Sequence, residues 1–237
     1  MVQALLQLCS QARQGHTSLY QYSGICYGFL KWQTAASKST RLLQLARSVA
    51  DPSNVIDRMK LSLLSDPTSR APDLQVVFGD GYIGTRGYPA NITSGYVHIS
   101  GANASAKPLI DPRYISNAFD LEATKEAAKY LRKMGTSSPF KELWAKEYDP
   151  GFDTQTDEQW EAYVRENVST FYHLLETCAM PTKENGGVVD PELKVYGVRN
   201  LRVVDASVIP IMSSANIQTA VYGIAERAAE IIAKKYR

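Results

Sequence analysis

Apolar side chains recur at helical spacing in two parts of the amino-terminal third of the chain. Residues 5–12 and 56–64 each place apolar side chains three or four positions apart, which is the spacing of one face of an α-helix. The aromatic segment between them, at 18–32, is interrupted by glycine, so a strand or a pocket-lining loop is expected there as readily as a helix. The pattern therefore predicts two helices separated by a segment whose structure stays open.

Two short segments in the middle of the chain are expected to form strands. LQVVF at 74–78 is a continuous apolar run typical of a buried strand, and YVHIS at 96–100 alternates apolar and polar positions. PLIDPRY at 108–114 then leads into a helix. This helix is expected to turn its apolar residues inward and to keep its charged residues outside, namely Glu122, Lys125, Glu126 and Lys129.

The carboxyl-terminal half adds a loop, two helices and one more strand. Residues 137–157 combine aromatic side chains with proline and glycine, which predicts a loop that acts as a lid. A helix is expected to begin at Asp157, because its acidic first turn complements the helix dipole. NLRVVDASV at 200–208 is predicted as an apolar strand, and residues 216–235 as a long helix with one apolar side.

Composition narrows the classes of partner. The 26 basic and 24 acidic residues give a formal charge of +2 without a stripe of lysine and arginine, so nucleic acid is not expected to bind. No apolar run reaches the roughly 18 residues that span a bilayer. The first residues are also too polar for a secretory leader. We therefore expect a cytoplasmic protein that acts on a small-molecule substrate. Three cysteines without C-x-x-C spacing argue against a metal site.

A dinucleotide-binding fingerprint, G-x-G-x-x-G, is matched by GDGYIG at residues 79–84. The fingerprint binds a pyrophosphate only where its third glycine opens a helix, whose N-terminus receives the phosphates. TRGYPANITSG follows here, and its proline and glycines prevent a helix from starting at that point. The motif therefore predicts a tight turn and not a dinucleotide site.

From residue 171 onward, the chain carries a series of short motifs in a fixed order. A histidine is followed by T-C-A-M, then by GGVVD, VYG, LRVVDAS and a helix that contains AERAA. Their order and spacing resemble the carboxyl-terminal signature of the glucose-methanol-choline (GMC) oxidoreductases. Upstream, DGYIGTRGYP, YVHIS and PLIDPRYISNAFDLE resemble the substrate-domain strands of the fungal-type members. The resemblance covers residues 75–237 well and the first 70 residues weakly.

The resemblance implies an α+β (α/β-like) fold in one domain across residues 1–237. Residues 1–170 would form the substrate-domain portion, with a mainly antiparallel sheet backed by helices. Residues 171–237 would carry the carboxyl-terminal signature, including a remnant strand and helix of the flavin domain.

The resemblance also assigns a catalytic pair. The matching family histidine, here His173, acts as a general base on a substrate hydroxyl, and its partner, here Asn216, donates a hydrogen bond to the same oxygen. Imidazole titrates near neutral pH and suits proton abstraction, and an amide stabilises a developing alkoxide without titrating. Without the motif, His173 would be read as a core residue and Asn216 as a helix N-cap. The motif favours the catalytic roles, and Asn216 can fill both.

The chain departs from the family in its cofactor contacts. An amino-terminal ADP-binding unit has no counterpart near the start of the sequence. In the family, the residues matching Asp205 and Ala206 lie near the FAD phosphates, and the one matching Ile217 lies near the isoalloxazine ring. These contacts alone would not hold the cofactor. We therefore expect no cofactor in the isolated chain. FAD is expected to bind only where a partner chain supplies the missing segment.

A second departure lies in the histidine motif itself. The glycine that allows close approach of the flavin is here Glu176, which places a carboxylate near an anionic cofactor. Two interpretations stay open. Glu176 is either a surface acid on a shifted loop or a second acid/base group beside His173.

The sequence supports three hypotheses, in this order. The first is a cofactor-independent enzyme that cyclises, isomerises or dehydrates a polyketide-like or aromatic substrate, or catalyses its cycloaddition, because positioning alone supplies roughly 7 to 11 kcal/mol in the best intramolecular cases. The second is a subunit or fragment of a split FAD-dependent alcohol oxidase or dehydrogenase, partnered by a flavin-domain chain. The third is a non-catalytic remnant that binds a small molecule. An apolar face left by the missing segment would also favour a homo-oligomer.

Overall fold

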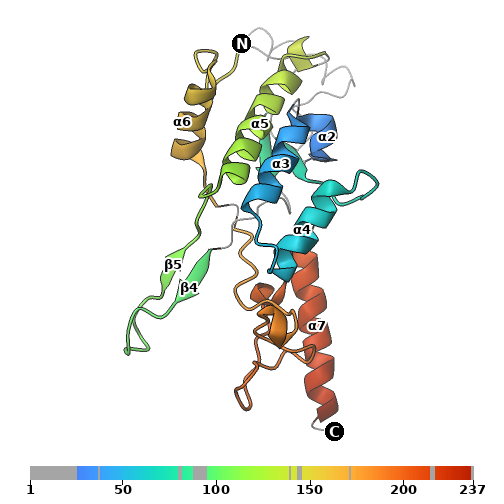
Figure 1. Cartoon of the computed structure of the whole chain (residues 1–237), viewed down its shortest axis with the longest axis vertical. Coiled ribbons are helices and arrows are strands. Elements are labelled where there is room, and N and C mark those ends of the chain that lie inside the picture. Colours follow the sequence, from blue (N-terminus) through green and yellow to red (C-terminus); the bar gives the residue numbers. More distant parts are fainter. Residues whose placement is uncertain are drawn as a thin grey trace, which may run out of the picture.

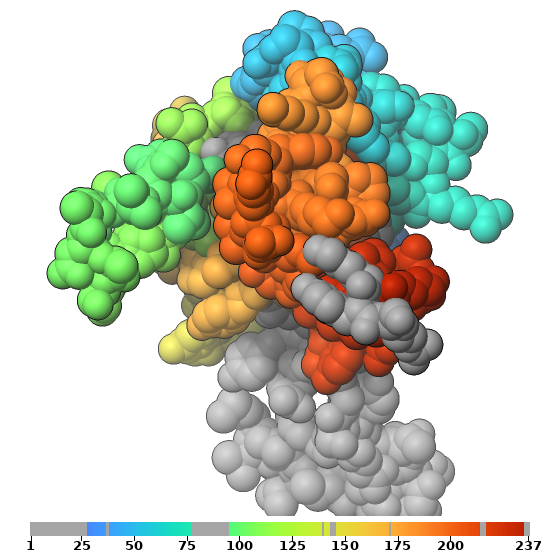
Figure 2. Space-filling model, turned by 90° about the horizontal axis from the view of Figure 1, so that it is seen from below, coloured from blue at the N-terminus to red at the C-terminus, as the bar shows by residue number. Residues whose placement is uncertain are grey.

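The computed structural model of the chain has an upper region of helices packed on a small sheet and a lower carboxyl-terminal region built around one long helix (Figure 1). A two-stranded ribbon projects from the side of the molecule in both views (Figures 1 and 2). The helix predicted at 5–12 lies outside the described residues. The structure describes residues 26–36, 38–79, 82–87, 95–138, 140–142, 146–170, 172–213 and 217–235.

The sheet of the upper region is antiparallel, with its second strand in the middle. Its strands are β1 (Cys26–Leu30), β2 (Leu74–Gly79) and β3 (Tyr82–Gly87). β2 confirms the strand predicted at 74–78, and β1 shows that the aromatic segment contains a strand. Gly79 pairs with Tyr82, so the glycine motif lies at the reversal of a hairpin, and β3 follows in place of a helix. The tight-turn interpretation is therefore confirmed.

Helices cover this sheet and supply most of the apolar core. They are α2 (Trp32–Ala35), α3 (Ser39–Val49), α4 (Val55–Ser65) and α5 (Ala118–Gly135). Their buried side chains, among them Trp32, Leu42, Ala46 and Phe119, pack with Leu74 of β2 into one cluster. An antiparallel sheet backed by helices is the α+β arrangement that the family resemblance implies.

Helix α4 confirms the helix predicted at 56–64, but not the side it buries. The side chain of Asn54 accepts a hydrogen bond from the amide of Ile56 at 2.8 Å and so caps the first turn. Met59 is 50% exposed, whereas Lys60 is only 2% exposed. The apolar pattern misplaced the buried side because Lys60 meets a charge from a distant segment, described below.

Helix α5 likewise buries charged residues that the pattern placed outside. Glu122, Lys125 and Glu126 are all buried. Lys125 lies 2.9 Å from Glu122 and 3.6 Å from Asp157 at the start of the next helix. Lys38, just before α3, lies 3.6 Å from Glu122. The prediction of an exposed charged face is wrong because these residues pair with one another and with residues of two other segments, and paired charges tolerate burial.

The helix predicted to begin at Asp157 is α6 (Asp157–Asn167). Its first turn carries a capping box, in which the side chain of Thr156 accepts from the amide of Gln159 and the side chain of Gln159 accepts from the amide of Thr156. The helix therefore starts at the residue that the sequence indicated.

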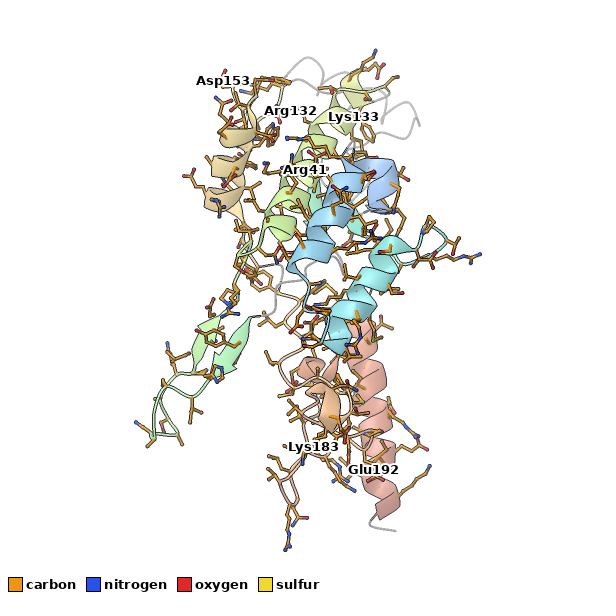
Figure 3. The ribbon with its side chains drawn as sticks, viewed as in Figure 1. Arg41, Arg132, Lys133, Asp153, Lys183 and Glu192 are labelled. Atoms are coloured by element: carbon orange, nitrogen blue, oxygen red, sulfur yellow. The ribbon has the colours of Figure 1, made fainter. Side chains whose placement is uncertain are left out.

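The loop before α6 is fastened to α5 by one arginine, which Figure 3 labels between the two helices. A short 3-10 turn, η2 (Phe140–Glu142), opens this region. Arg132 donates to both carboxylate oxygens of Glu147, at 2.9 and 3.0 Å, and to the carbonyl oxygen of Gly151 at 3.0 Å. Its guanidinium lies 4.3 Å from the ring centroid of Trp160 on α6. The predicted lid is thus a loop whose described part is fixed by Arg132.

The ribbon consists of β4 (Tyr96–His98) and β5 (Leu109–Asp111). β4 confirms part of the strand predicted at 96–100. β5 occupies a segment that was expected only to lead into a helix. Val97, Ile99 and Ile110 are 48%, 86% and 67% exposed, so the apolar side chains of the ribbon lie outside the core.

The lower region has a small core of its own. It contains η3 (Lys183–Asn185), η4 (Ala206–Val208) and the long helix α7 (Gln218–Lys235), which confirms the helix predicted at 216–235. Val189, Leu193 and Val208 are buried against Ala228 of α7. Among the described residues, no helix is long and apolar enough to cross a membrane.

The strand predicted at 200–208 is reduced to one isolated bridge between Lys194 and Arg202, followed by η4. An apolar run forms a ladder only where a neighbouring strand runs beside it for several residues. That length of pairing is not found for this segment within the described residues, so the strand prediction is wrong in its extent.

Candidate functional site

The candidate histidine lies on an irregular segment between α6 and the lower core. His173 is half-buried, whereas its neighbours Tyr172 and Leu174 are 83% and 72% exposed. The two residues that flank the histidine in sequence therefore expose large apolar side chains, while the histidine itself is partly covered.

Glu176 is brought together with a residue that the sequence did not suggest. Its carboxylate lies 3.1 Å from the ammonium of Lys60 on α4, and one of its oxygens accepts a hydrogen bond from that ammonium at 3.2 Å. The Lys60 side chain is 2% exposed and the Glu176 side chain 18% exposed. A close, largely buried ion pair therefore joins α4 to the segment that carries His173.

The backbone at Glu176 has a conformation that favours glycine. Its φ of +77° lies in the left-handed region, where side chains of L-residues crowd the following carbonyl oxygen. Glycine, the residue that the family motif has at this position, adopts such a φ without this crowding. The chain retains the glycine-type backbone although it carries a glutamate.

The histidine segment also contacts the turn that carries two of the predicted cofactor residues. The amide of Cys178 donates a hydrogen bond to the carbonyl oxygen of Ser207 at 3.0 Å. Asp205, directly before η4, accepts from the amide of Ser207 at 2.8 Å and so fixes the turn around Ala206. The structure thus brings the segment of His173 next to Asp205 and Ala206.

The GGVVD motif adopts a backbone that requires both of its glycines. Gly186 has a φ of +81°. A Cβ atom on Gly187 would lie 1.8 Å from the carbonyl oxygen of Pro181, so no side chain fits there. The amide of Val188 then donates to the carbonyl oxygen of Ala179 at 2.9 Å, which closes the motif onto the histidine segment.

Two further predicted residues have different outcomes. Ile217 is described, lies directly before α7 and is 9% exposed. Asn216, the predicted partner of His173, lies outside the described residues. The roles assigned to His173, Asn216, Glu176, Asp205, Ala206 and Ile217 stay predictions.

The ion pair bears on whether the site suits a flavin. The ammonium of Lys60 balances the carboxylate of Glu176, so the glutamate does not add a net negative charge beside an anionic cofactor. The exposed surface at Tyr172 and Leu174 adjoins the same segment. The described residues are therefore compatible with a flavin that is held mainly by another part of the protein. Among them, no group of three or more His, Cys, Asp or Glu side chains is placed to hold a metal ion.

Sequence reasoning missed Lys60, although a weak signal was present. Lys60 precedes Leu64 by four residues and so lies on the same side of the helix as this apolar residue. Leu64 is 6% exposed, which places the lysine on the buried side as well. A charged residue on an apolar side indicates a buried partner, but nothing local identifies Glu176 as that partner.

Comparison with known proteins identifies the relatives of this chain. A sequence model described as GMC oxidoreductase matches residues 92–225. The GMC oxidoreductase family protein Mala s 12 of Malassezia sympodialis is 45% identical over 141 residues, which is 60% of this chain and 23% of that protein. The glucose oxidase-like protein fsoC of Humicola fuscoatra is 44% identical over 139 residues, which is 58% of this chain and 24% of that protein.

A solved structure of an FAD-dependent oxidoreductase from Chaetomium thermophilum matches the fold with a TM-score of 0.78 and 28% identity, over 89% of this chain and 39% of that one. The chain thus spans about a quarter of the length of the curated relatives that it matches.

Proposed function

Because the chain belongs to the GMC oxidoreductase family, we propose that it supplies the substrate-side and carboxyl-terminal part of a flavin-dependent enzyme that oxidises an alcohol. The observation that carries this proposal is the histidine segment, which has the family motif, exposes Tyr172 and Leu174, and is hydrogen-bonded through Cys178 to the turn of Asp205 and Ala206. The flavin-binding part would come from the same polypeptide or from a partner chain. A cytoplasmic location and a small-molecule substrate remain part of the proposal.

His173 is proposed to accept the proton of the substrate hydroxyl at a ring nitrogen. Asn216 would donate a hydrogen bond to the same oxygen and so stabilise the charge that develops there. Tyr172 and Leu174 would exclude water from the reacting carbon once the rest of the protein covers them. When bound, FAD would supply a two-electron acceptor for the hydride that leaves the carbinol carbon, and the alcohol becomes a carbonyl compound.

The turn at Asp205 and Ala206 would hold one edge of the cofactor, with Ile217 near its ring system. Asp205 is exposed, and its carboxylate already fixes the backbone of the turn. A turn that is formed before the cofactor arrives reduces the entropy lost on binding.

The cofactor-independent hypothesis has less support than the redox one. It rested on the loss of cofactor contacts, and its chief local sign was the carboxylate of Glu176. Lys60 balances that charge. The relatives named above include a glucose oxidase-like protein and an FAD-dependent oxidoreductase, and none is named a cyclase or an isomerase.

An absorbance spectrum distinguishes these two functions. The native protein that contains this chain, purified from its source, should show flavin bands, and an alcohol substrate should bleach them under anaerobic conditions. A colourless preparation that still converts a small molecule would refute the redox proposal and favour the cofactor-independent one. A colourless preparation without turnover on any alcohol tested would favour the binding remnant.

A further inference from the structure

The chain contains a charge that has no role in the chemistry described so far, the ammonium of Lys60. Lys60 belongs to α4, which Figure 1 draws below α3 and above α7, and the residue is 2% exposed. A buried ammonium without a counter-charge costs several kcal/mol, so its partner matters more than that of a surface lysine. The partner is Glu176, 116 positions further along the chain.

Glu176 is itself held against a conformational preference. Its φ of +77° costs a non-glycine residue about 1–2 kcal/mol relative to glycine. The contact with Lys60, at 3.1 Å, contributes an attraction that opposes this cost. The glutamate therefore does more than occupy a position that suits glycine. Its side chain links a residue of left-handed backbone conformation to α4.

The ion pair of Lys60 with Glu176 holds the chain just after His173, whereas α6 precedes the histidine in the sequence. Glu176 follows His173 by three residues, and Cys178 follows Glu176 by two. The amide of Cys178 is hydrogen-bonded to the carbonyl oxygen of Ser207. The segment is thus attached to α4 through Glu176, to the turn of Asp205 through Cys178, and to the GGVVD motif through Ala179. The side chains of Tyr172 and Leu174 are largely exposed, so they contribute little to the packing of this segment.

We infer that Lys60 is a positioning residue for His173, which acts by holding Glu176 and with it the backbone of the histidine segment. This inference rests on the proposed function insofar as His173 is taken as the acid/base group. Lys60 itself acts on the histidine only through Glu176.

The test observes the histidine ring directly and needs no catalytic activity. The whole 237-residue chain contains three histidines, at positions 16, 98 and 173, and His173→Gln assigns the ring resonances of His173 by NMR. Lys60→Met should shift or broaden these resonances and leave those of His98, on the ribbon, in place. The matched control is Lys125→Met, which breaks another buried pair, Lys125 with Glu122, in the upper region. It should leave the His173 resonances unchanged.

The double variant Lys60→Met/Glu176→Gly covers the case in which Lys60→Met alone fails to fold. It removes both charges, restores the glycine of the family motif and should fold, yet its His173 resonances should still differ from those of the wild type. Unchanged His173 resonances in the folded double variant would overturn the inference, and so would an equal change in Lys125→Met.

Activity separates this inference from the proposed function. In the native protein, Lys60→Met should lower kcat by several-fold and leave KM nearly unchanged, because the substrate still binds but the base is misplaced. If His173→Gln retains full activity while Lys60→Met shifts the ring resonances, the proposed function fails and the positioning inference stands. If His173→Gln abolishes activity and Lys60→Met alters neither resonances nor kcat, only the positioning inference fails.

Discussion

The ion pair of Lys60 with Glu176 predicts a large non-additive effect on stability, which a double-mutant cycle measures. Lys60→Met leaves a carboxylate whose side chain is 18% exposed without its counter-charge. Breaking a fully buried pair from one side costs about 3–5 kcal/mol, and the partial exposure of Glu176 reduces the cost for this variant to about 2–3 kcal/mol.

The second single variant of the cycle, Glu176→Gly, changes the free energy of unfolding through two opposing effects. Glu176→Gly leaves the ammonium of Lys60, which is 2% exposed, without a counter-charge, at a cost of about 3 kcal/mol. It also removes the strain of a left-handed glutamate, a gain of about 1 kcal/mol. The variant should therefore lose about 2 kcal/mol.

The double variant has neither charge nor strain, so its free energy of unfolding should lie within about 1 kcal/mol of the wild type. The coupling between the two positions is then about 4 kcal/mol. Urea denaturation of the whole chain, followed by circular dichroism, gives the four free energies. Arg165→Ala, which breaks an exposed pair with Glu161 on α6, is the control and should change stability by less than about 0.5 kcal/mol. Additive losses in the double variant would refute the reasoning.

Two further predictions concern the contacts of α5 with α6 and its loop. A hydrogen bond from Lys129, with other nearby lysines, lowers the pKa of Asp157 to about 2, so the stability it contributes is complete above its ordinary pKa of 3.8 and is lost as the pH falls toward 2. Asp157→Asn should flatten the fall of the melting temperature across this range, and an unchanged pH profile would contradict it. Arg132→Lys should cost about 1–2 kcal/mol, because lysine cannot contact Glu147 and Gly151 and stack on the Trp160 ring at once. Limited proteolysis should then cleave the loop at 146–156 faster, and a wild-type cleavage rate would refute the role of Arg132.

Local patterns predicted those parts of the fold whose cause is local. β2 is a continuous apolar run, and α6 starts at an acidic turn with a capping box. The positions of α6 and α7 follow from neighbouring residues, so the sequence indicates them correctly. The glycine motif was interpreted correctly for the same reason, because the residues after it exclude a helix.

The errors share a different cause, because each depends on a partner far away in the chain. Glu122 and Lys125 were expected outside, yet Asp157 pairs with Lys125 and makes its burial tolerable. The strand at 200–208 needs a neighbouring strand and is only a bridge. Lys60 was overlooked because its counter-charge lies 116 residues further on. Sequence spacing describes a side of a helix but not what that side meets.

The candidate site shows the same division. The family motif located His173 and the turn at Asp205 by local signature, and the hydrogen bond from Cys178 to Ser207 joins their segments. Glu176 was interpreted as a charge that opposes a flavin. Its ion pair changes that interpretation, because the charge is balanced within the chain.

The most direct test of the central claim is the rate of anaerobic flavin reduction by an alcohol in the native protein and in its His173→Gln variant. If His173 is the acid/base group of a flavin-dependent alcohol oxidation, the variant should keep its flavin bands and lose about 100-fold or more in the reduction rate. A reduction rate equal to that of the wild type would contradict the account.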